Sequence, residues 1–283
     1  MTMQRNLKAV AALAVGLLCF AQVQAQGLEP LKLYDDFKAD SLDPLRWLGA
    51  EQARFIKGNK LHLMQRNWPL VISDSGATPF SYNENFRNPS FITAIKARVT
   101  VKELEVSSCA ANTSVGDSRA RLTGAFFNVG TASPPSAIGD AIAQIRVIRR
   151  SDSTDAARVL RVEGVVTQCT NADCSMGADI GPIVELGTVR IGTAVTLEMQ
   201  WDALNDRFLF SRDDGKMTGS VVYGAFLNAS TGQPIQDSSP PGSLNKSLST
   251  RMFVPNCLSG PRISGMVDAT FDNVFVNASY PSP

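Results

Sequence analysis

The chain has 283 residues, of which 44% are apolar and 19% are charged, and its formal net charge at pH 7 is +1. A surface so close to neutral gives no electrostatic reason to expect a nucleic acid or an anionic membrane surface as partner. No stretch after residue 25 is apolar enough to cross a bilayer, so we expect no membrane span in the mature protein.

The first 25 residues have the layout of a secretory signal peptide. Arg5 and Lys8 form a basic start, residues 9–20 are an apolar run, and Val23-Gln24-Ala25 is a small-x-small cleavage motif. A retained anchor is the alternative, but the run is shorter than the roughly 20 residues of a spanning helix. We therefore predict a signal peptide over residues 1–25, a single domain over residues 26–283, and export to the periplasm or the extracellular space.

Four cysteines remain after the signal: Cys109, Cys169, Cys174 and Cys257. An even number in an exported chain predicts two disulfides. A Cys169–Cys174 bond would clamp a loop tip and leave Cys109 to pair with Cys257, although the sequence allows three connectivities. A zinc site is disfavoured, because the one histidine, His62, lies in a predicted strand and C-x4-C is not a usual zinc spacing.

Short segments in which polar and apolar residues alternate recur along the mature chain, separated by glycine, proline and asparagine residues typical of turns. No segment of ten or more residues after the signal shows a helical period. We therefore predict an all-β fold, a two-sheet antiparallel β-sandwich of the jelly-roll type. Residues 68–88 and 228–249 are predicted to be irregular, because prolines and polar residues interrupt them. In chain order, the predicted strands cover residues 31–37, 54–56, 60–64, 91–106, 121–129, 141–150, 157–168, 183–191, 194–202, 207–212, 220–226 and 270–277.

The least ambiguous element is a hairpin over residues 194–212. Apolar residues from Val195 to Trp201 alternate with polar ones, which places one row of side chains in a core. Residues 203–206 form a short turn, and the return strand carries Phe208 and Phe210 on one face. Earlier in the chain, the alternation shifts after Lys102, which predicts a β-bulge or a change of partner sheet.

Four motifs occur in an informative order: Asp35-Asp36-Phe37 followed by residues 42–47, the Gly58-Asn59 turn, the Trp201-Asp202 hairpin, and the final segment 271–276. In this order they resemble the concanavalin A-like lectin/glucanase superfamily, which includes laminin G-like jelly rolls. The resemblance spans nearly all of the mature chain. It implies two curved antiparallel sheets with a ligand groove on the concave face.

Glucanases of this superfamily carry alternate carboxylates on one strand, in an E-x-D-x-x-E pattern. Alternate strand residues project the same way about 6.5–7 Å apart, close to the separation that a retaining glycosidase needs. The matching strand here is 141–150, whose predicted groove-facing residues include no carboxylate: Ile142, Gln144, Arg146 and Ile148. Glu103 and Glu105 are the nearest substitute, and we interpret them as a solvated strand end. The sequence therefore lacks the glucanase catalytic motif and favours a non-catalytic role.

The predicted ligand-binding residues combine planar aromatics with hydrogen-bonding groups, which suit the C–H faces and hydroxyls of sugars. They are Gln144, Arg146, Arg161, Glu163, Trp68 and Tyr82. A structural calcium ion is a further expectation, because Asp36 and Asp272 could meet where the first and last strands adjoin; the alternative is that they only form turns. We expect no other cofactor.

Three functional hypotheses follow. The first is an exported, lectin-like carbohydrate-binding or adhesive module of the cell envelope, with a glycan or polysaccharide as partner. The second is an atypical glycoside hydrolase or polysaccharide lyase of the same fold, using Glu103 and Glu105. The third is a structural, protein-binding component of the envelope.

Overall fold

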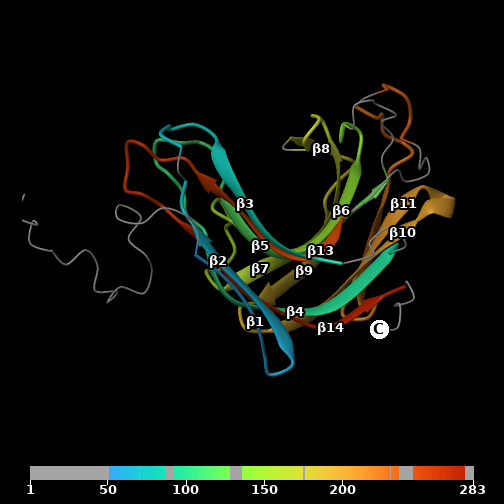
Figure 1. The fold of residues 1–283 in the computed structure, drawn as a ribbon, viewed down its shortest axis with the longest axis horizontal. Coiled ribbons are helices and arrows are strands. Elements are labelled where there is room, and N and C mark those ends of the chain that lie inside the picture. Colours follow the sequence, from blue (N-terminus) through green and yellow to red (C-terminus); the bar gives the residue numbers. More distant parts are fainter. Residues whose placement is uncertain are drawn as a thin grey trace, which may run out of the picture. The chain divides into compact units, whose positions relative to one another are not determined.

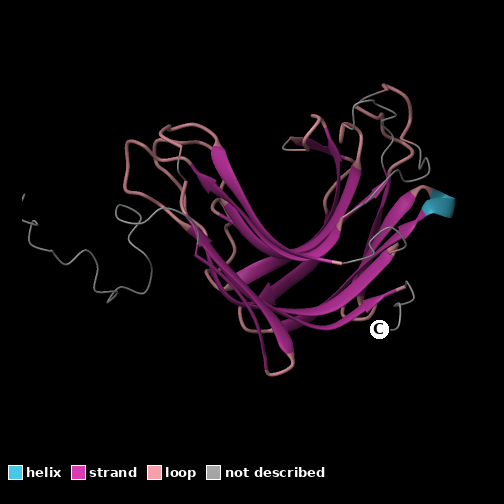
Figure 2. Ribbon diagram, viewed as in Figure 1, coloured by secondary structure: helices cyan, strands magenta, loops and turns pink. Residues whose placement is uncertain are grey.

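A computed structural model describes residues 51–69, 71–86, 92–127, 136–174, 176–229, 231–235 and 245–277. The regular structure of these residues is β-strand apart from one short helical turn, η2 (Ala203–Asn205), which Figure 2 shows. In chain order the strands are β1 Glu51–Lys57, β2 Lys60–Asn67, β3 Ala77–Asn85, β4 Ala94–Glu105, β5 Asp117–Phe127, β6 Ala141–Arg150, β7 Val159–Cys169, β8 Gly177–Asp179, β9 Val184–Arg190, β10 Ala194–Asp202, β11 Arg207–Arg212, β12 Met217–Val222, β13 Lys246–Pro255 and β14 Gly265–Val276.

The strands form two seven-stranded antiparallel sheets (Figure 1). Sheet A has the order β1-β2-β14-β4-β10-β11-β12. Sheet B has the order β3-β13-β5-β6-β7-β8, and β9 also pairs with β7. The predicted fold class, an all-β antiparallel sandwich, is therefore confirmed.

The core lies between the sheets and is built from alternate residues of the strands. On β5 the side chains of Ala120 and Leu122 are fully buried, as are those of Ala143 and Ile145 on β6 and Leu197 on β10. Since alternate residues point to opposite faces, the intervening residues of β5 and β6 lie on the face of sheet B that points away from sheet A.

An aromatic cluster fills one end of the core. The rings of Phe126, Phe127, Trp201, Phe208 and Tyr223 lie 5.0–6.4 Å apart between centroids. Trp201 Nε1 donates a hydrogen bond of 3.0 Å to Tyr223 Oη, so the polar ends of both rings are satisfied. Packing of this kind fixes how the two sheets sit on each other.

The long strands of sheet B bend along their length (Figures 1 and 2). Sheet A packs against the outside of the bend, so the other face of sheet B lies on its inside. We call the latter the concave face. It consists of the residues that alternate with the core residues on β3, β13, β5, β6 and β7.

Several local predictions agree with the strands observed. The central hairpin is β10 and β11, and the strand predicted at 141–150 is β6. The shift in alternation after Lys102 is a bulge, because Glu103 pairs with Asp268 and Val101 pairs with the next residue, Ala269.

Two predictions of irregular structure were wrong. Residues 77–85 form β3, an edge strand whose Pro79 is tolerated because one side of an edge strand needs no hydrogen bonds. Residues 246–249 belong to β13, which lies between β3 and β5 in sheet B. The short strand β8 was not predicted at all.

The structure pairs Cys109 with Cys257 and Cys169 with Cys174, which is the connectivity favoured from the sequence. Within the described ranges, no helix is long and apolar enough to span a membrane. The signal peptide, the strand predicted at 31–37 and Asp36 lie outside the described residues, and the predicted domain bounds stay a prediction.

Candidate functional site

The most unusual feature of the described residues is a group of arginines on the concave face of sheet B. It comprises Arg119 and Arg121 on β5, Arg146 and Arg150 on β6, and Arg251 on β13. We call these five residues the arginine cluster. Arg119, Arg121 and Arg146 are only 5–6% exposed. Arginine is rarely buried to this degree unless its charge is paired.

The strand register brings these side chains together. Arg121 lies opposite Arg146 on one side and Ser249 on the other, and Arg119 lies opposite Arg251. Directly opposed residues in an antiparallel pair have Cβ atoms about 4.5–5.5 Å apart, and like charges so placed repel each other. The cluster therefore concentrates positive charge on the middle strands of the sheet.

Glu163 on β7 neutralises one edge of the cluster. Its side chain is fully buried, and it accepts hydrogen bonds from Arg146 at 3.1 and 2.9 Å and from Arg150 at 2.6 and 2.8 Å. Burial acts to raise the pKa of Glu163, but the hydrogen bonds and charges of the two arginines outweigh it and lower the pKa. The hydrogen bond to Glu163 in turn raises the pKa of Arg150. This carboxylate is held ionised and is fully occupied by its partners.

Among the described residues, the other three arginines have no carboxylate that binds them in this way. Arg121 donates to two neutral oxygens, Ser249 Oγ at 3.3 Å and Gln144 Oε1 at 3.1 Å. Burial, reinforced by neighbouring guanidinium charges, lowers the pKa of Arg121 well below its ordinary value. The Nε atom of Arg251 is buried without a hydrogen-bond partner, and burial lowers the pKa of that side chain as well.

Arg119 is only partly compensated. Its Nε lies 3.4 Å from Asp117 Oδ1, and neither of these two atoms makes a hydrogen bond. Burial and neighbouring arginines lower the pKa of Arg119 to about 9, although Asp117 opposes the shift. The guanidinium carbons of Arg119 and Arg251 lie 5.2 and 4.7 Å from the centroid of the Phe253 ring, so both cations also contact an aromatic ring.

Four of the six ligand-binding residues predicted from the sequence lie in the arginine cluster or close to it. Gln144, Arg146 and Glu163 lie in or beside the arginine cluster. Arg161 lies at its margin, where Nε forms a 2.8 Å ion pair with Asp155.

The two predicted aromatics do not join this face. Trp68 is only 3% exposed and so offers no free ring face to a ligand, and Tyr82 packs against the hydrophobic core from β3. Sequence reasoning missed Arg119, Arg121 and Arg251. The available signal was Asp117, Arg119 and Arg121 at alternate positions, just before and at the predicted strand start.

The carboxylate and metal candidates lie elsewhere. Glu103 and Glu105 are exposed near the end of β4, as interpreted from the sequence. Asp272 is half-buried and lies opposite Arg98 on β4, and its calcium partner Asp36 is outside the described residues. Within the described ranges, one group has metal-ligand spacing, Asp74 with Cys109 and Cys257, but these cysteines are bonded to each other and provide no thiolate. Calcium stays a prediction.

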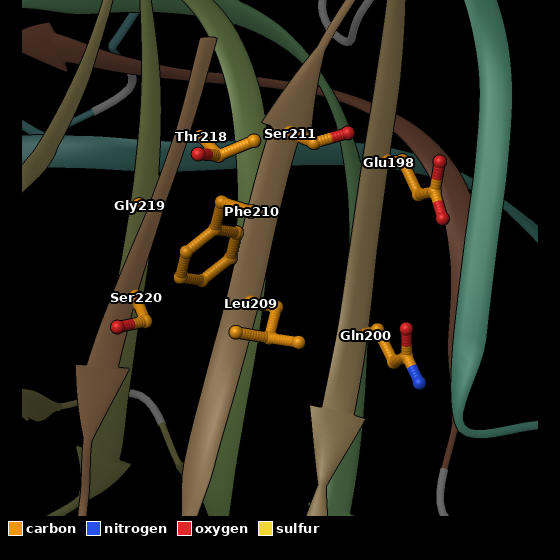
Figure 3. Close-up of a pocket in the computed structure, with 8 residues that line it drawn as sticks. All are labelled: Glu198, Gln200, Leu209, Phe210, Ser211, Thr218, Gly219 and Ser220. Atoms are coloured by element: carbon orange, nitrogen blue, oxygen red, sulfur yellow. The ribbon is translucent and has the colours of Figure 1, made fainter. Parts of the chain in front are cut away.

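Two cavities bear on the choice of site. One of about 310 Å³ lies on the outer face of sheet A, where Figure 3 shows Glu198, Gln200, Leu209 and Ser220 around it. Its one charged group, Glu198, lies 3.6 Å from Lys96. A second cavity, of about 180 Å³, is lined by Arg150 and Arg161 and adjoins the arginine cluster. We place the site at the cluster, because two carboxylates, Asp117 and Glu163, are shared there by five arginines among the described residues.

No family model matches the chain, and no curated protein matches it. Among solved structures, a family 7 alginate lyase, A1-II', is 14% identical with a TM-score of 0.42, over 85% of this chain and 86% of that one. The carbohydrate recognition domain of Emp46p is 8% identical with a TM-score of 0.35, over 79% and 87%. A β-1,3-glucanase from Mycobacterium marinum is 12% identical with a TM-score of 0.35, over 77% of each chain. At such identities and TM-scores we draw no functional conclusion from these similarities.

Fold and site together define the class: an antiparallel β-sandwich in which the concave face of sheet B carries a partly uncompensated arginine cluster.

Proposed function

We propose that the protein is an exported glycan-binding module and that its ligand lies across the concave face of sheet B. The observation that supports this proposal is one row of side chains in register across five strands. In spatial order the row is Asn83, Ser249, Arg121, Arg146 and Glu163. Neighbouring strands are about 4.8 Å apart, so the row spans about 19 Å. A row of that length suits an oligosaccharide rather than a single sugar.

The chemistry of the row suits sugars. The Asn83 amide and the guanidinium groups of Arg121 and Arg146 offer hydrogen-bond partners that sugar hydroxyls can match. The fully buried Ser249 and Glu163 hold those guanidinium groups in place. Asn83 is exposed at the β3 edge, while Arg121 and Arg146 are deeply set in the middle of the sheet. An oligosaccharide bound along the row would contact solvated groups at the β3 edge and preorganised cations in the middle of the sheet. Preorganised groups favour affinity, because little side-chain entropy is lost on binding.

A binding role without turnover is the simplest account of the acids on this face. Glu163 accepts hydrogen bonds from two arginines and has a lowered pKa, so it is poorly placed to carry a proton at neutral pH. Asp117 Oδ1 is buried beside Arg119. Two disulfides support export, because such bonds persist in oxidising compartments.

Calorimetric titration of the mature protein with a panel of defined oligosaccharides tests the proposal. We expect binding to at least one glycan, and we expect Asn83→Ala to weaken it about fivefold, the effect of one lost hydrogen bond. Gln200→Ala is the matched control, because Gln200 lies on the outer face of sheet A. Absence of binding across the panel, or equal weakening by both variants, would contradict the proposal.

A further inference from the structure

The arginine cluster carries more positive charge than its surroundings neutralise. Within the described residues of the cluster, five guanidinium groups share two carboxylates, Asp117 and Glu163. Glu163 serves Arg146 and Arg150. The remaining three, Arg119, Arg121 and Arg251, share one ionic contact, the 3.4 Å approach of Asp117 Oδ1 to Arg119 Nε. We call these three residues the arginine triad.

Among the described residues, the Asp117–Arg119 contact is the one ion pair that the triad makes. Burying an unpaired ion costs several kcal/mol even after relaxation, and opposed like charges such as Arg119 and Arg251 add repulsion. The contacts with Phe253 recover part of this cost, and each is worth about 0.5–2 kcal/mol. An apolar residue at any of the three positions would avoid the cost. Charges held at a net cost to folding are expected chiefly at functional or strained sites.

The ligand group that completes the triad is an oxyanion. Guanidinium groups match carboxylates and sulfates through paired N–H donors, and such charge-assisted bonds are about twice as strong as neutral ones. The buried Nε of Arg119 and of Arg251 are donors without acceptors. Ser249 and Gln144, bound to Arg121, hold its guanidinium in a fixed orientation.

We infer that the glycan is acidic, and that Arg119, Arg121 and Arg251 receive the carboxylate or sulfate group of one of its sugars. This inference rests on the proposed function, since it names the class of glycan that the concave face takes. Arg121 belongs to both the triad and the Asn83–Glu163 row, so one sugar can place its acidic group at the triad while its neighbours use the rest of the row. The Phe253 ring borders the triad and offers a face to the same sugar.

Charged and uncharged forms of the same oligosaccharide provide the test. One arm compares oligogalacturonate with its fully methyl-esterified form, and a second compares a sulfated galactan oligosaccharide with its desulfated form. Titrations of the mature protein in 0.1 M NaCl should show that one acidic form binds about 10- to 100-fold more tightly than its uncharged counterpart. The arm that responds identifies the acidic group.

Variants then assign the preference to the triad. Arg121→Gln and Arg251→Gln should each reduce the ratio of charged to uncharged binding to less than about threefold, because each removes one charge-assisted contact. Lys96→Gln is the control: Lys96 is a cation on the other sheet, bound to Asp214 at 2.6 Å, and its loss should leave the ratio unchanged. Circular dichroism checks folding. If Arg121→Gln does not fold, the partly exposed Arg251 carries the test.

Each other outcome has a distinct meaning. Equal binding of charged and uncharged forms, or a ratio that the triad variants leave intact, overturns the inference but leaves the proposed function standing. Loss of all glycan binding overturns both. Inorganic sulfate or phosphate that binds as tightly as the oligosaccharides, or a single-stranded oligonucleotide that binds more tightly, would show that the triad serves another anion, and would also overturn the inference.

Discussion

Replacing Glu163 by glutamine tests the electrostatic account of the concave face most directly. The substitution keeps the size of the side chain but removes the charge that Arg146 and Arg150 share. Glu163 is fully buried and accepts hydrogen bonds at 2.6–3.1 Å. Removing one partner of a buried ion pair costs about 3–5 kcal/mol, because the other charge is left uncompensated. A domain with an unfolding free energy of about 5–15 kcal/mol would lose a large share of its stability.

Urea unfolding at pH 7 measures the unfolding free energy that Glu163→Gln loses, and repeating it at lower pH tests whether the charge of Glu163 is the cause. Because the folded state lowers the pKa of Glu163, the stabilisation is present above the ordinary value of 4.5 and is lost as the pH falls through the lowered value. The gap between wild type and variant should therefore narrow below pH 4.5. Asp155→Asn, which touches the half-exposed Arg161, is the control and should cost much less. A loss below about 1 kcal/mol for Glu163→Gln would refute the reasoning.

Three further predictions concern the rest of the sandwich. Burial lowers the pKa of Lys246 from 10.5 to about 8, so Lys246→Met should raise stability at pH 7 by up to about 3 kcal/mol. That gain should shrink between pH 8 and 10.5, where the native lysine loses its proton; a gain independent of pH would contradict the cause. Gly164→Ala would place a Cβ 2.3 Å from the Phe210 ring, so calorimetry should show a loss of at least about 1–3 kcal/mol. Replacing Cys109 and Cys257 by serine opens a loop with a sequence separation of 148, and should lower the unfolding free energy by about 4–5 kcal/mol in urea titrations. No change under non-reducing conditions would mean that the bond is absent.

The sequence was sufficient to predict the fold because apolar and polar residues alternate locally in most strands. In β10 the apolar row from Val195 to Trp201 is uninterrupted, and its bounds were recovered. In β13 the residues Ser247, Ser249 and Arg251 face the concave side, and the first residue that faces the core is Lys246. Polar residues on both faces therefore obscured the alternation that predicts a strand. The strand β3 was missed because it contains a proline, which an edge strand tolerates.

The site was harder to predict because it depends on long-range register. Gln144, Arg146 and Glu163 belong to neighbouring strands of the chain and were recognised. Arg119 and Arg251 are directly opposed, yet 132 positions apart in the sequence, and only the pairing of β5 with β13 brings them together. No local pattern specifies such a pairing.

The Cys109–Cys257 bond has a consequence for proteolysis. It joins the segment after β4 to the segment after β13, and the chain between them contains nine of the described strands, β5 to β13. A protease that cuts once anywhere inside this span releases no fragment, because both pieces remain tethered through sulfur. Nicked molecules would then migrate as intact chains until a reductant is added, and the sheet pairings would hold the cut ends in place.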